Sequence, residues 1–302
     1  MLQVARLAPQ QLGESRSLVA AFLKSRLTAD GGFADRAGAA DLYYTVFGLE
    51  GLLALQEPVP AEAVRGYLRR FGDGGGLDFA HLACLARCWA GVSRDLAGVP
   101  GAGVLSQIEA YRTADGGYAP TAGAAHGNAY SSFLALGAYQ DLRARPPEAE
   151  RLTDSLRPLR ARDGGYANRP GDPHGITTVT AAVALVLRTL DAPLDPSLGM
   201  WLLDRCQASG GFVATPRTPI PDLLSTATAL HALAALHVPI AGLLEPCLDF
   251  VDSLWTNRGG FYGSWVDETL DCEYTYYGLL ALGHLTVAAP PVTEMPGVAR
   301  RT

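Results

Sequence analysis

Paired glycines recur along the whole chain, and in most copies an aromatic residue follows the pair. The pairs are Gly31-Gly32, Gly74-Gly75, Gly116-Gly117, Gly164-Gly165, Gly210-Gly211 and Gly259-Gly260. They lie roughly 45 residues apart, a repeat length that suits one pair of helices with its loops. Glycine accepts backbone conformations that end a helix, and it lets two backbones approach closely. Each pair is therefore expected to stop one helix and to turn the chain into the loop before the next.

The segments that follow these turns are apolar or small on nearly all sides. They begin at Asp41, Asp78, Gly127, Ile176, Asp222 and Asp271. A helix that is apolar all round is a buried helix. Segments with one polar face alternate with them, at 10–27, 61–71, 101–112, 148–160, 196–207 and 242–255. Their apolar residues recur at spacings of three and four, which is typical of helices that cover a core.

This alternation predicts a closed ring. An open solenoid of helix pairs would leave an apolar face uncovered at each end, whereas a ring covers both. We therefore predict an all-α (α/α)6 barrel, a toroid of six inner and six outer helices. Residues 1–302 form one domain, with repeats beginning near 31, 74, 116, 164, 210 and 259 and a C-terminal tail at 287–302. The amino ends of the inner helices then meet at one mouth of the barrel.

Composition narrows the classes of protein. Hydrophobic residues make up 48% and charged residues 18% of the chain, which fits a large buried core. A net charge of −6 without a basic cluster argues against nucleic-acid binding. No apolar run approaches the ~20 residues of a membrane span, so no integral membrane segment is expected. Five cysteines without a disulfide spacing, and no apolar signal segment in residues 1–10, indicate a reduced, cytoplasmic setting.

The repeat resembles a known family. Gly-Gly-aromatic turns followed by helices of the type Asp-x-x-Tyr-Thr, as in residues 41–45 and 271–275, are similar to those of protein prenyltransferase β subunits and terpenoid cyclase toroids. The likeness covers roughly residues 10–286. It implies an isoprenoid or similar apolar ligand in the central cavity, with a helical partner subunit possible. Because one fold hosts many chemistries, the residues of the family's sites are compared one by one.

The resemblance implies a zinc site that this chain does not keep. The family's Asp-x-Cys pair falls on Asp222-Leu223-Leu224, and its histidine falls on Tyr274. Leucine cannot bind zinc, so no metal is expected there. An alternative metal pair is Asp78 with His81, one helical turn apart; the other interpretation is a capping aspartate beside an interior histidine. The aspartate-rich magnesium motif of class I cyclases is absent, and the sequence makes no prediction about magnesium.

Candidate ligand-binding residues lie in the loops before the inner helices. His174-Gly175 matches the family's diphosphate-binding His-Gly, and Arg217 supplies a base in the fifth loop, whereas the family's lysine and tyrosine positions there are not kept. Helix amino ends that converge on one mouth favour anions, and Arg169 and His126 join them there. We expect His174, Arg217, Arg169 and His126 to hold a diphosphate or other acid group. The alternative is that they are solvated surface charges.

Acidic and aromatic residues are expected at the same mouth. Most of the aspartates that open the inner helices suit helix capping. Among the acidic residues, Asp271, Glu273 and Asp222 are candidate acids, since burial and like charges raise the pKa of a carboxyl group. Tyr44, Tyr130 and Tyr274 are expected to line the apolar wall, where aromatic faces stabilise cations. The protonating Asp-x-Asp-Asp motif of class II cyclases is absent.

Three hypotheses follow. The first is a prenyltransferase-like or terpenoid cyclase-like enzyme that binds an isoprenoid, with or without a diphosphate, in the barrel. The second is a non-catalytic toroid that binds a partner protein or peptide, since the family's zinc ligands are missing. The third is a carbohydrate-active α/α barrel, in which only Trp89 and Trp265 come near the inner helices or the mouth.

Overall fold

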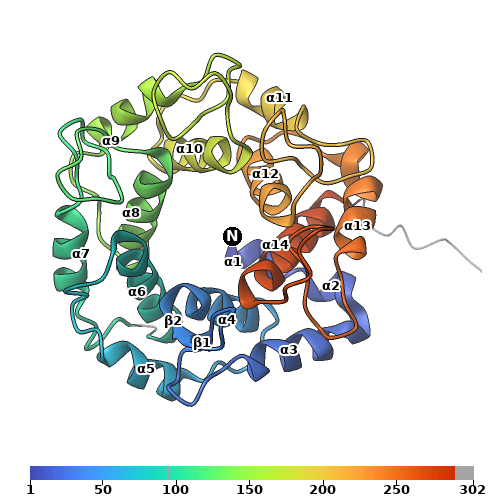
Figure 1. The fold of residues 1–302 in the computed structure, drawn as a ribbon, viewed down its shortest axis with the longest axis horizontal. Helices are drawn as coiled ribbons and strands as arrows, with labels where there is room; N and C mark the ends of the chain where they lie inside the picture. Colours follow the sequence, from blue (N-terminus) through green and yellow to red (C-terminus); the bar gives the residue numbers. More distant parts are fainter. Residues whose placement is uncertain (94, 290–302) are drawn as a thin grey trace, which may run out of the picture.

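The computed structural model describes residues 1–93 and 95–289 and is a closed ring of helices (Figure 1). The inner helices are α4 (Leu42–Ala54), α6 (Phe79–Val92), α8 (Ala129–Asp141), α10 (Thr177–Thr189), α12 (Leu223–Ala235) and α14 (Cys272–Ala288). The outer helices are α3 (Arg16–Ser25), α5 (Ala61–Arg69), α7 (Gly101–Glu109), α9 (Ala149–Leu156), α11 (Ser197–Leu203) and α13 (Leu244–Ser253). Each inner helix contacts the next, and α14 contacts α4. The predicted (α/α)6 toroid is confirmed.

The remaining elements are short. At the N-terminal end lie α1 (Leu2–Ala5), α2 (Pro9–Leu12) and the 3-10 turn η1 (Gly13–Ser15), and two further 3-10 turns are η2 (Arg157–Leu159) and η3 (Ala241–Leu243). Strands β1 (Phe33–Ala34) and β2 (Ala40–Asp41) pair antiparallel, with Phe33 opposite Asp41. The outer helices are shorter than the sequence pattern predicts. The first predicted segment, for example, is interrupted at Gly13, whose φ of 52° is not helical.

Aspartate capping sets where most inner helices begin. The side chains of Asp41, Asp78, Asn128, Asp222 and Asp271 each accept a hydrogen bond from the backbone N–H three residues on. These bonds are 2.7–3.0 Å long, and caps of this kind stabilise a helix by about 1 kcal/mol. Helix α10 begins differently: the Thr177 N–H donates to the Ala214 carbonyl, and its hydroxyl donates to the Val213 carbonyl. The predicted capping role of the aspartates is confirmed.

A threonine or serine ties most glycine turns to the inner helix that follows. The N–H of the aromatic turn residue donates to a hydroxyl four residues after the cap: Phe33 to Thr45, Tyr118 to Ser132, Tyr166 to Thr180, and Phe212 to Thr226. The second repeat has Gly76 and Leu82 at these two positions, so the hydroxyl that would accept the N–H is missing there. At Gly210, with φ of 82°, an added Cβ would lie 1.8 Å from the Pro246 carbonyl oxygen. The turn therefore packs directly on the next outer helix.

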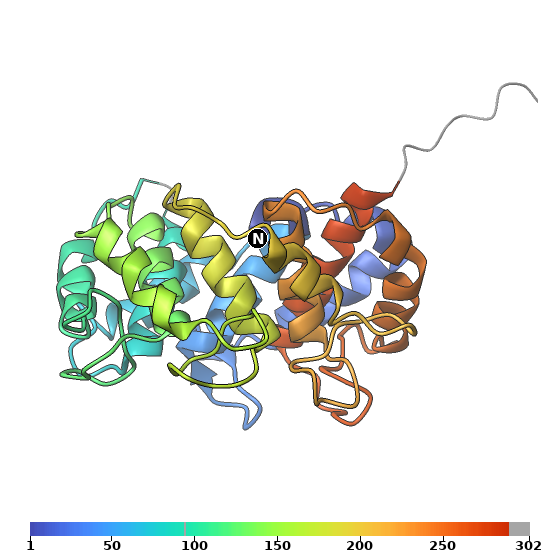
Figure 2. The ribbon, with the colours of Figure 1, turned by 90° about the horizontal axis from the view of Figure 1, so that it is seen from above.

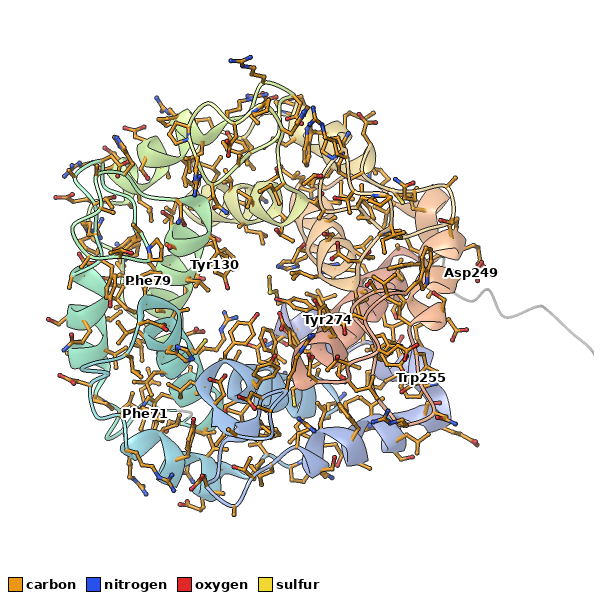
Figure 3. All side chains as sticks on the ribbon, in the orientation of Figure 1. Phe71, Phe79, Tyr130, Asp249, Trp255 and Tyr274 are labelled. Carbon is orange, nitrogen blue, oxygen red and sulfur yellow. The ribbon has the colours of Figure 1, made fainter. Side chains whose placement is uncertain are left out.

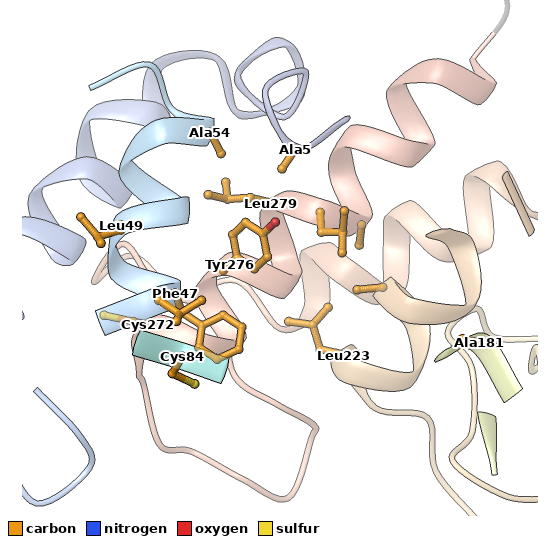
Figure 4. Packing of buried hydrophobic residues seen from close by; sticks show 14 of the residues in the cluster. Ala5, Phe47, Leu49, Ala54, Cys84, Ala181, Leu223, Cys272, Tyr276 and Leu279 are labelled. Atoms are coloured by element: carbon orange, nitrogen blue, oxygen red, sulfur yellow. The ribbon is translucent and has the colours of Figure 1, made fainter. Parts of the chain in front are cut away.

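The hydrophobic core fills the wall of the ring. Leu49 of α4 and Leu279 of α14 are fully buried among neighbouring helices (Figure 4). The loops after the glycine pairs gather on one face of the ring (Figure 2), which is the face where the inner helices begin. Helix α1 lies inside the ring toward the other face and contacts α14 and α4 (Figures 1 and 2).

Two further observations concern membrane-spanning helices and the predicted C-terminal tail. None of the helices over residues 1–93 and 95–289 has the length and apolarity that a bilayer crossing needs. Of the predicted tail at 287–302, Val287 and Ala288 belong to the last turn of α14, and residues 290–302 lie outside the described residues.

Candidate functional site

A cavity opens inside the ring, between α4, α6, α8 and α14. Its volume is about 130 Å³. The unfilled space is about 920 Å³ when the part that is open to solvent is counted as well. Aromatic side chains dominate its wall: Tyr43, Phe47, Tyr130, Phe133, Tyr276 and Tyr277. Helix α10 adds Leu185 and Thr189, whereas no lining residue in the described chain comes from α12. The cavity is therefore set to one side of the ring.

Helical spacing explains why these residues share a wall. On α4, Tyr43, Phe47 and Glu50 line the cavity, and on α6, Ala80, Cys84 and Arg87 do. Residues three and four apart lie on the same face of a helix. Each helix thus presents its first turn near the mouth and a charged residue in its later turns. Figure 3 shows Tyr130 on the inner wall at the start of α8.

Glu273 lies at the mouth end of this wall. The Tyr43 hydroxyl donates a hydrogen bond of 2.6 Å to the Glu273 carboxylate. Burial, together with the nearby Asp271, raises the pKa of Glu273 to about 6. Burial also raises the pKa of Tyr130 to about 12, so its phenol stays protonated. Glu273 is not itself among the residues that line the cavity; it contacts the aromatic part of the wall through Tyr43.

Asp271 lies two residues earlier and is held differently. Its side chain is fully buried; one oxygen caps α14, and the other accepts a 2.9 Å bond from Arg36 Nε. Arg36 also contacts Asp267 at 3.2 Å, and its guanidinium lies 5.6 Å from the ring centre of Tyr274. Burial raises the pKa of Asp271 against the opposing effect of its hydrogen bonds and of Arg36. With both oxygens engaged, Asp271 joins the ends of the ring at this point.

Asp222, the third predicted acid, caps α12. It accepts hydrogen bonds from the Ser225 N–H at 2.7 Å and from the Ser225 hydroxyl at 2.8 Å. Burial raises the pKa of Asp222. It does not belong to the cavity lining. Of the three predicted acids, Glu273 therefore lies nearest to the cavity wall, through Tyr43.

A second polar group lines the cavity toward the carboxyl ends of α4, α6 and α8, near the amino group of Met1. Arg87 Nε is 3.0 Å from Asp141 Oδ2 and 3.5 Å from Glu50 Oε1. All three side chains of this group line the cavity. Tyr276 lines the cavity on the neighbouring helix α14. The sequence analysis missed this group; its available signal is a charged residue nine positions after the cap in α4 and again in α6.

His81 lies between two carboxylates at the mouth. Its Nε2 is 3.1 Å from Asp41 Oδ2, and its Nδ1 is 2.9 Å from Asp78. Burial opposes protonation, but the two carboxylates outweigh it and raise the pKa of His81. Within the described chain, no group of three or more His, Cys, Asp or Glu side chains is arranged to hold a metal. A metal at the Asp78–His81 pair would have to displace one of these contacts.

The structure does not bring the predicted anion-binding residues to the cavity. His174 Nδ1 is 3.7 Å from Asp163, and His126 Nδ1 is 3.5 Å from Asp115, which is the equivalent contact one repeat earlier. Both aspartates also accept bonds from the glycine after the histidine. Arg169 and Arg217 are exposed in loops, and none of these four residues lines the cavity.

The predicted tyrosines divide between wall and mouth. Tyr130 lines the cavity. Tyr274 packs over Gly263 beside Arg36 (Figure 3), and Tyr44 lies against Tyr43 with ring centres 5.6 Å apart. Tyr44 and Tyr274 therefore belong to the mouth, whereas Tyr43, Tyr276 and Tyr277 complete the wall.

The ring of helix pairs and its inner cavity define an α/α toroid. A family model described as the prenyltransferase alpha-alpha toroid domain matches residues 7–72, 72–212 and 196–294. The chain belongs to this family, as the resemblance in its repeats predicts. No curated protein matches the chain significantly.

Solved structures share the fold at low sequence identity. A type II terpene cyclase from Scytonema, in complex with geranylgeranyl dihydroxybenzoate, has a TM-score of 0.64 and 17% identity over 93% of this chain and 98% of its own. Protein geranylgeranyltransferase-I from Candida albicans, complexed with GGPP, has a TM-score of 0.67 and 12% identity over 89% and 90%. An α-1,6-mannanase from Salegentibacter has a TM-score of 0.58 and 12% identity over 92% and 99%. The likeness to all three is a likeness of fold.

Proposed function

We propose that this chain is an enzyme that binds an isoprenoid or similar apolar ligand in the cavity and that Glu273 donates the proton that starts its reaction. The observation that carries the proposal is the hydrogen bond that Tyr43, a residue of the aromatic cavity wall, donates to Glu273, whose pKa is raised to about 6. A carboxyl group with such a pKa is partly protonated near neutral pH and can act as a general acid.

The chemistry of the wall supports a cationic intermediate. A proton transferred from the Glu273 carboxyl group to a carbon–carbon double bond leaves a carbocation on the ligand and a carboxylate on the protein. Tyrosine and phenylalanine faces attract a cation by about 0.5–2 kcal/mol each. Loss of a proton from the rearranged cation, back to the carboxylate, completes a cyclisation or isomerisation without oxidant or reductant. The Tyr43 hydroxyl keeps Glu273 oriented throughout.

Two solved structures that share the fold support the apolar ligand class. The Scytonema cyclase and the Candida transferase were both solved with a geranylgeranyl compound. The carbohydrate alternative finds less support in the cavity. Trp89 is buried in the core, and Trp265 lies exposed in a loop, where its indole N–H donates to the Ser253 hydroxyl at the end of α13. Neither tryptophan lines the cavity.

The test compares Glu273→Gln with wild-type protein. Farnesol, geranylgeraniol and their diphosphates are titrated in a calorimeter, and products are sought by mass spectrometry. We expect Glu273→Gln to bind its best ligand within about threefold of wild type but to lose at least roughly 100-fold in turnover, as the loss of a general acid predicts. Glu268→Gln, an exposed glutamate in the loop before α14, is the matched control and should keep wild-type turnover.

Two outcomes would contradict the proposal. If no isoprenoid binds the wild-type protein, the cavity does not have the assigned ligand class. If Glu273→Gln turns over as fast as wild type, Glu273 is not the acid. Binding without turnover in wild-type protein would favour the non-catalytic alternative, in which a partner subunit is sought by co-purification.

A further inference from the structure

Two of the five cysteines lie together away from the cavity, between the fifth glycine turn and the outer helix that follows it. Cys206 lies at the start of the turn and is partly exposed, whereas Cys247 is fully buried in the first turn of α13. The Cys206 thiol donates a hydrogen bond to the Cys247 sulfur. Both cysteines are free, so the two sulfurs form a dithiol.

The backbone keeps the two cysteines together. Cys206 pairs with Phe212 across the turn in an antiparallel bridge. The glycine pair inside the turn packs on the start of α13: a Cβ added at Gly210 would lie 1.8 Å from the Pro246 carbonyl oxygen and 3.0 Å from the Cys247 nitrogen. This contact between backbones fixes where the turn lies on α13. The two thiols therefore face each other whenever the fifth repeat is folded.

The surroundings of the pair favour the loss of one proton near neutral pH. The hydrogen bond from Cys206, with help from the Gly211 N–H, lowers the pKa of Cys247 to about 7 against the effect of burial. Transfer of the shared proton along this hydrogen bond places the thiolate on the partly exposed Cys206. A thiolate attacks oxidants, whereas a thiol does not. By contrast, burial raises the pKa of Cys272 to about 12, which keeps that thiol protonated.

We propose that Cys206 and Cys247 are a redox-active dithiol, which hydrogen peroxide converts into a disulfide between the fifth glycine turn and α13. The Cys206 thiolate attacks one peroxide oxygen and the O–O bond breaks, which leaves a sulfenic acid and a hydroxide that takes up a proton. The Cys247 sulfur then attacks the Cys206 sulfur, the S–O bond breaks, and the second oxygen leaves as water with the Cys247 proton. Two thiols lose two electrons, and one peroxide becomes two waters.

The disulfide would stabilise the ring without altering the cavity. Cys247 follows Cys206 by 41 positions, so the bond closes a loop that restricts the unfolded chain. The residues that line the cavity come from other segments. Oxidation should therefore raise the stability of the barrel and leave binding in the cavity unchanged. The inference does not depend on the proposed function.

The experiment follows the thiols of the full chain. The reduced, folded protein is treated with hydrogen peroxide, blocked with iodoacetamide in denaturant, and digested. We expect mass spectrometry to recover a peptide pair joined through Cys206 and Cys247, while Cys84, Cys88 and Cys272 carry the blocking group. The oxidised protein should melt roughly 5 °C or more above the reduced protein, and dithiothreitol should reverse the change.

Two variants separate the roles of the sulfurs. With Cys247→Ser, oxidation of Cys206 should stop at the sulfenic acid, which dimedone traps, and the midpoint of its alkylation should rise from about 7 to about 8.5. With Cys206→Ser, the buried Cys247 should resist the same dose of peroxide. Because Cys206 is partly exposed, this second variant disturbs the fold least. The matched control is Cys272→Ala, which removes a buried thiol elsewhere and should leave the yield of the disulfide unchanged.

Several outcomes would overturn the proposal. One is the absence of the Cys206–Cys247 peptide pair at a dose of peroxide that oxidises free cysteine. Another is a pair that forms only after the protein is unfolded in urea, because the folded turn would then not hold the thiols together. Disulfides between two chains in place of this pair would count against it equally. A rise in melting temperature that persists in Cys206→Ser would show that the stabilisation has another source.

Discussion

Glu273 and Asp271 are two carboxylates at the start of α14 that have different surroundings. Asp271 has an arginine and a helix end to neutralise it, and it is fully buried. Over residues 1–93 and 95–289, Glu273 has only the Tyr43 hydroxyl as a hydrogen-bond partner, so burial dominates and raises its pKa to about 6. Position relative to the cap decides this difference: the cap residue turns toward the helix end, whereas the residue two positions later turns toward the cavity wall.

The raised pKa of Glu273 predicts how stability depends on pH. A carboxyl group whose pKa rises from 4.5 to about 6 on folding binds its proton more tightly in the folded state. Its contribution to stability is full below pH 4.5 and is lost as the pH rises through about 6. Glu273→Gln, which mimics the protonated form, should therefore be about 1–2 kcal/mol more stable than wild type above pH 7.

The measurement is urea unfolding of both proteins at several pH values from 4 to 8. The difference between Gln and Glu should grow between pH 4.5 and about 6 and then level off. A difference that does not change over this range would show that Glu273 keeps an ordinary carboxyl group. A more stable but inactive variant is the pattern expected of a residue retained for chemistry.

At the scale of the element, one hydroxyl ties most of the glycine turns to the inner helix that follows. The fully buried Thr226 accepts the Phe212 N–H at 2.9 Å and donates to the Asp222 carbonyl at 2.7 Å. Thr45 makes the same two bonds, from the Phe33 N–H and to the Asp41 carbonyl, whereas Thr180 accepts the Tyr166 N–H but donates back to the Tyr166 carbonyl. One side chain thus joins the glycine turn, the cap and the inner helix, so the three parts form together.

This arrangement predicts unequal effects for two threonines of α12. Thr226→Val should destabilise the protein by about 1–3 kcal/mol, because it leaves the buried Phe212 N–H without a partner. Thr228→Val should change stability by less than about 0.5 kcal/mol, because the Thr228 hydroxyl only donates to carbonyls within its own helix. Free energies of unfolding from urea titrations test the pair. Equal losses for the two variants would mean that the turn does not depend on Thr226.

The sequence predicts these elements well because their causes are local. A cap at Asp222 or Asp271 and a glycine pair before it are set within a few residues, so the order of inner helices and the ring follow from the pattern. The cavity is harder to predict. Arg87, Asp141 and Tyr276 are ordinary members of apolar helices in the sequence, and only the crossing of three helices places them together. The same cause separates His174 and Arg217 from the cavity, since a loop's position in the repeat does not fix which way its side chains point.

At the scale of the whole molecule, α1 supports the join between the first and last inner helices. It contacts both α14 and α4, and its Ala5 is fully buried. The close approach requires a glycine: a Cβ added at Gly283 of α14 would lie 2.2 Å from the Val4 carbonyl oxygen. This small residue therefore lets α1 pack inside the ring.

Gly283→Ala is expected to displace α1. The clash with backbone cannot be relieved by a side-chain rotation, so we expect a loss of about 1–3 kcal/mol. Faster amide exchange in residues 1–8 should accompany the loss. Gly66→Ala in the outer helix α5 is the control: no atom lies within 4 Å of its added Cβ, and better helix propensity should stabilise the protein by about 0.5–1 kcal/mol. If both glycines respond alike, α1 is not held by this contact.

Two side-chain pairs at the mouth of the barrel also connect the first and last repeats. Tyr43 with Glu273 and Arg36 with Asp271 connect residues separated by more than two hundred positions in the chain. During synthesis, most of the barrel therefore leaves the ribosome before Glu273, the residue that we assign as the acid, has been made. Contacts of such long range form late in folding. We therefore expect activity to appear only at the end of folding, after α14 has packed against α4.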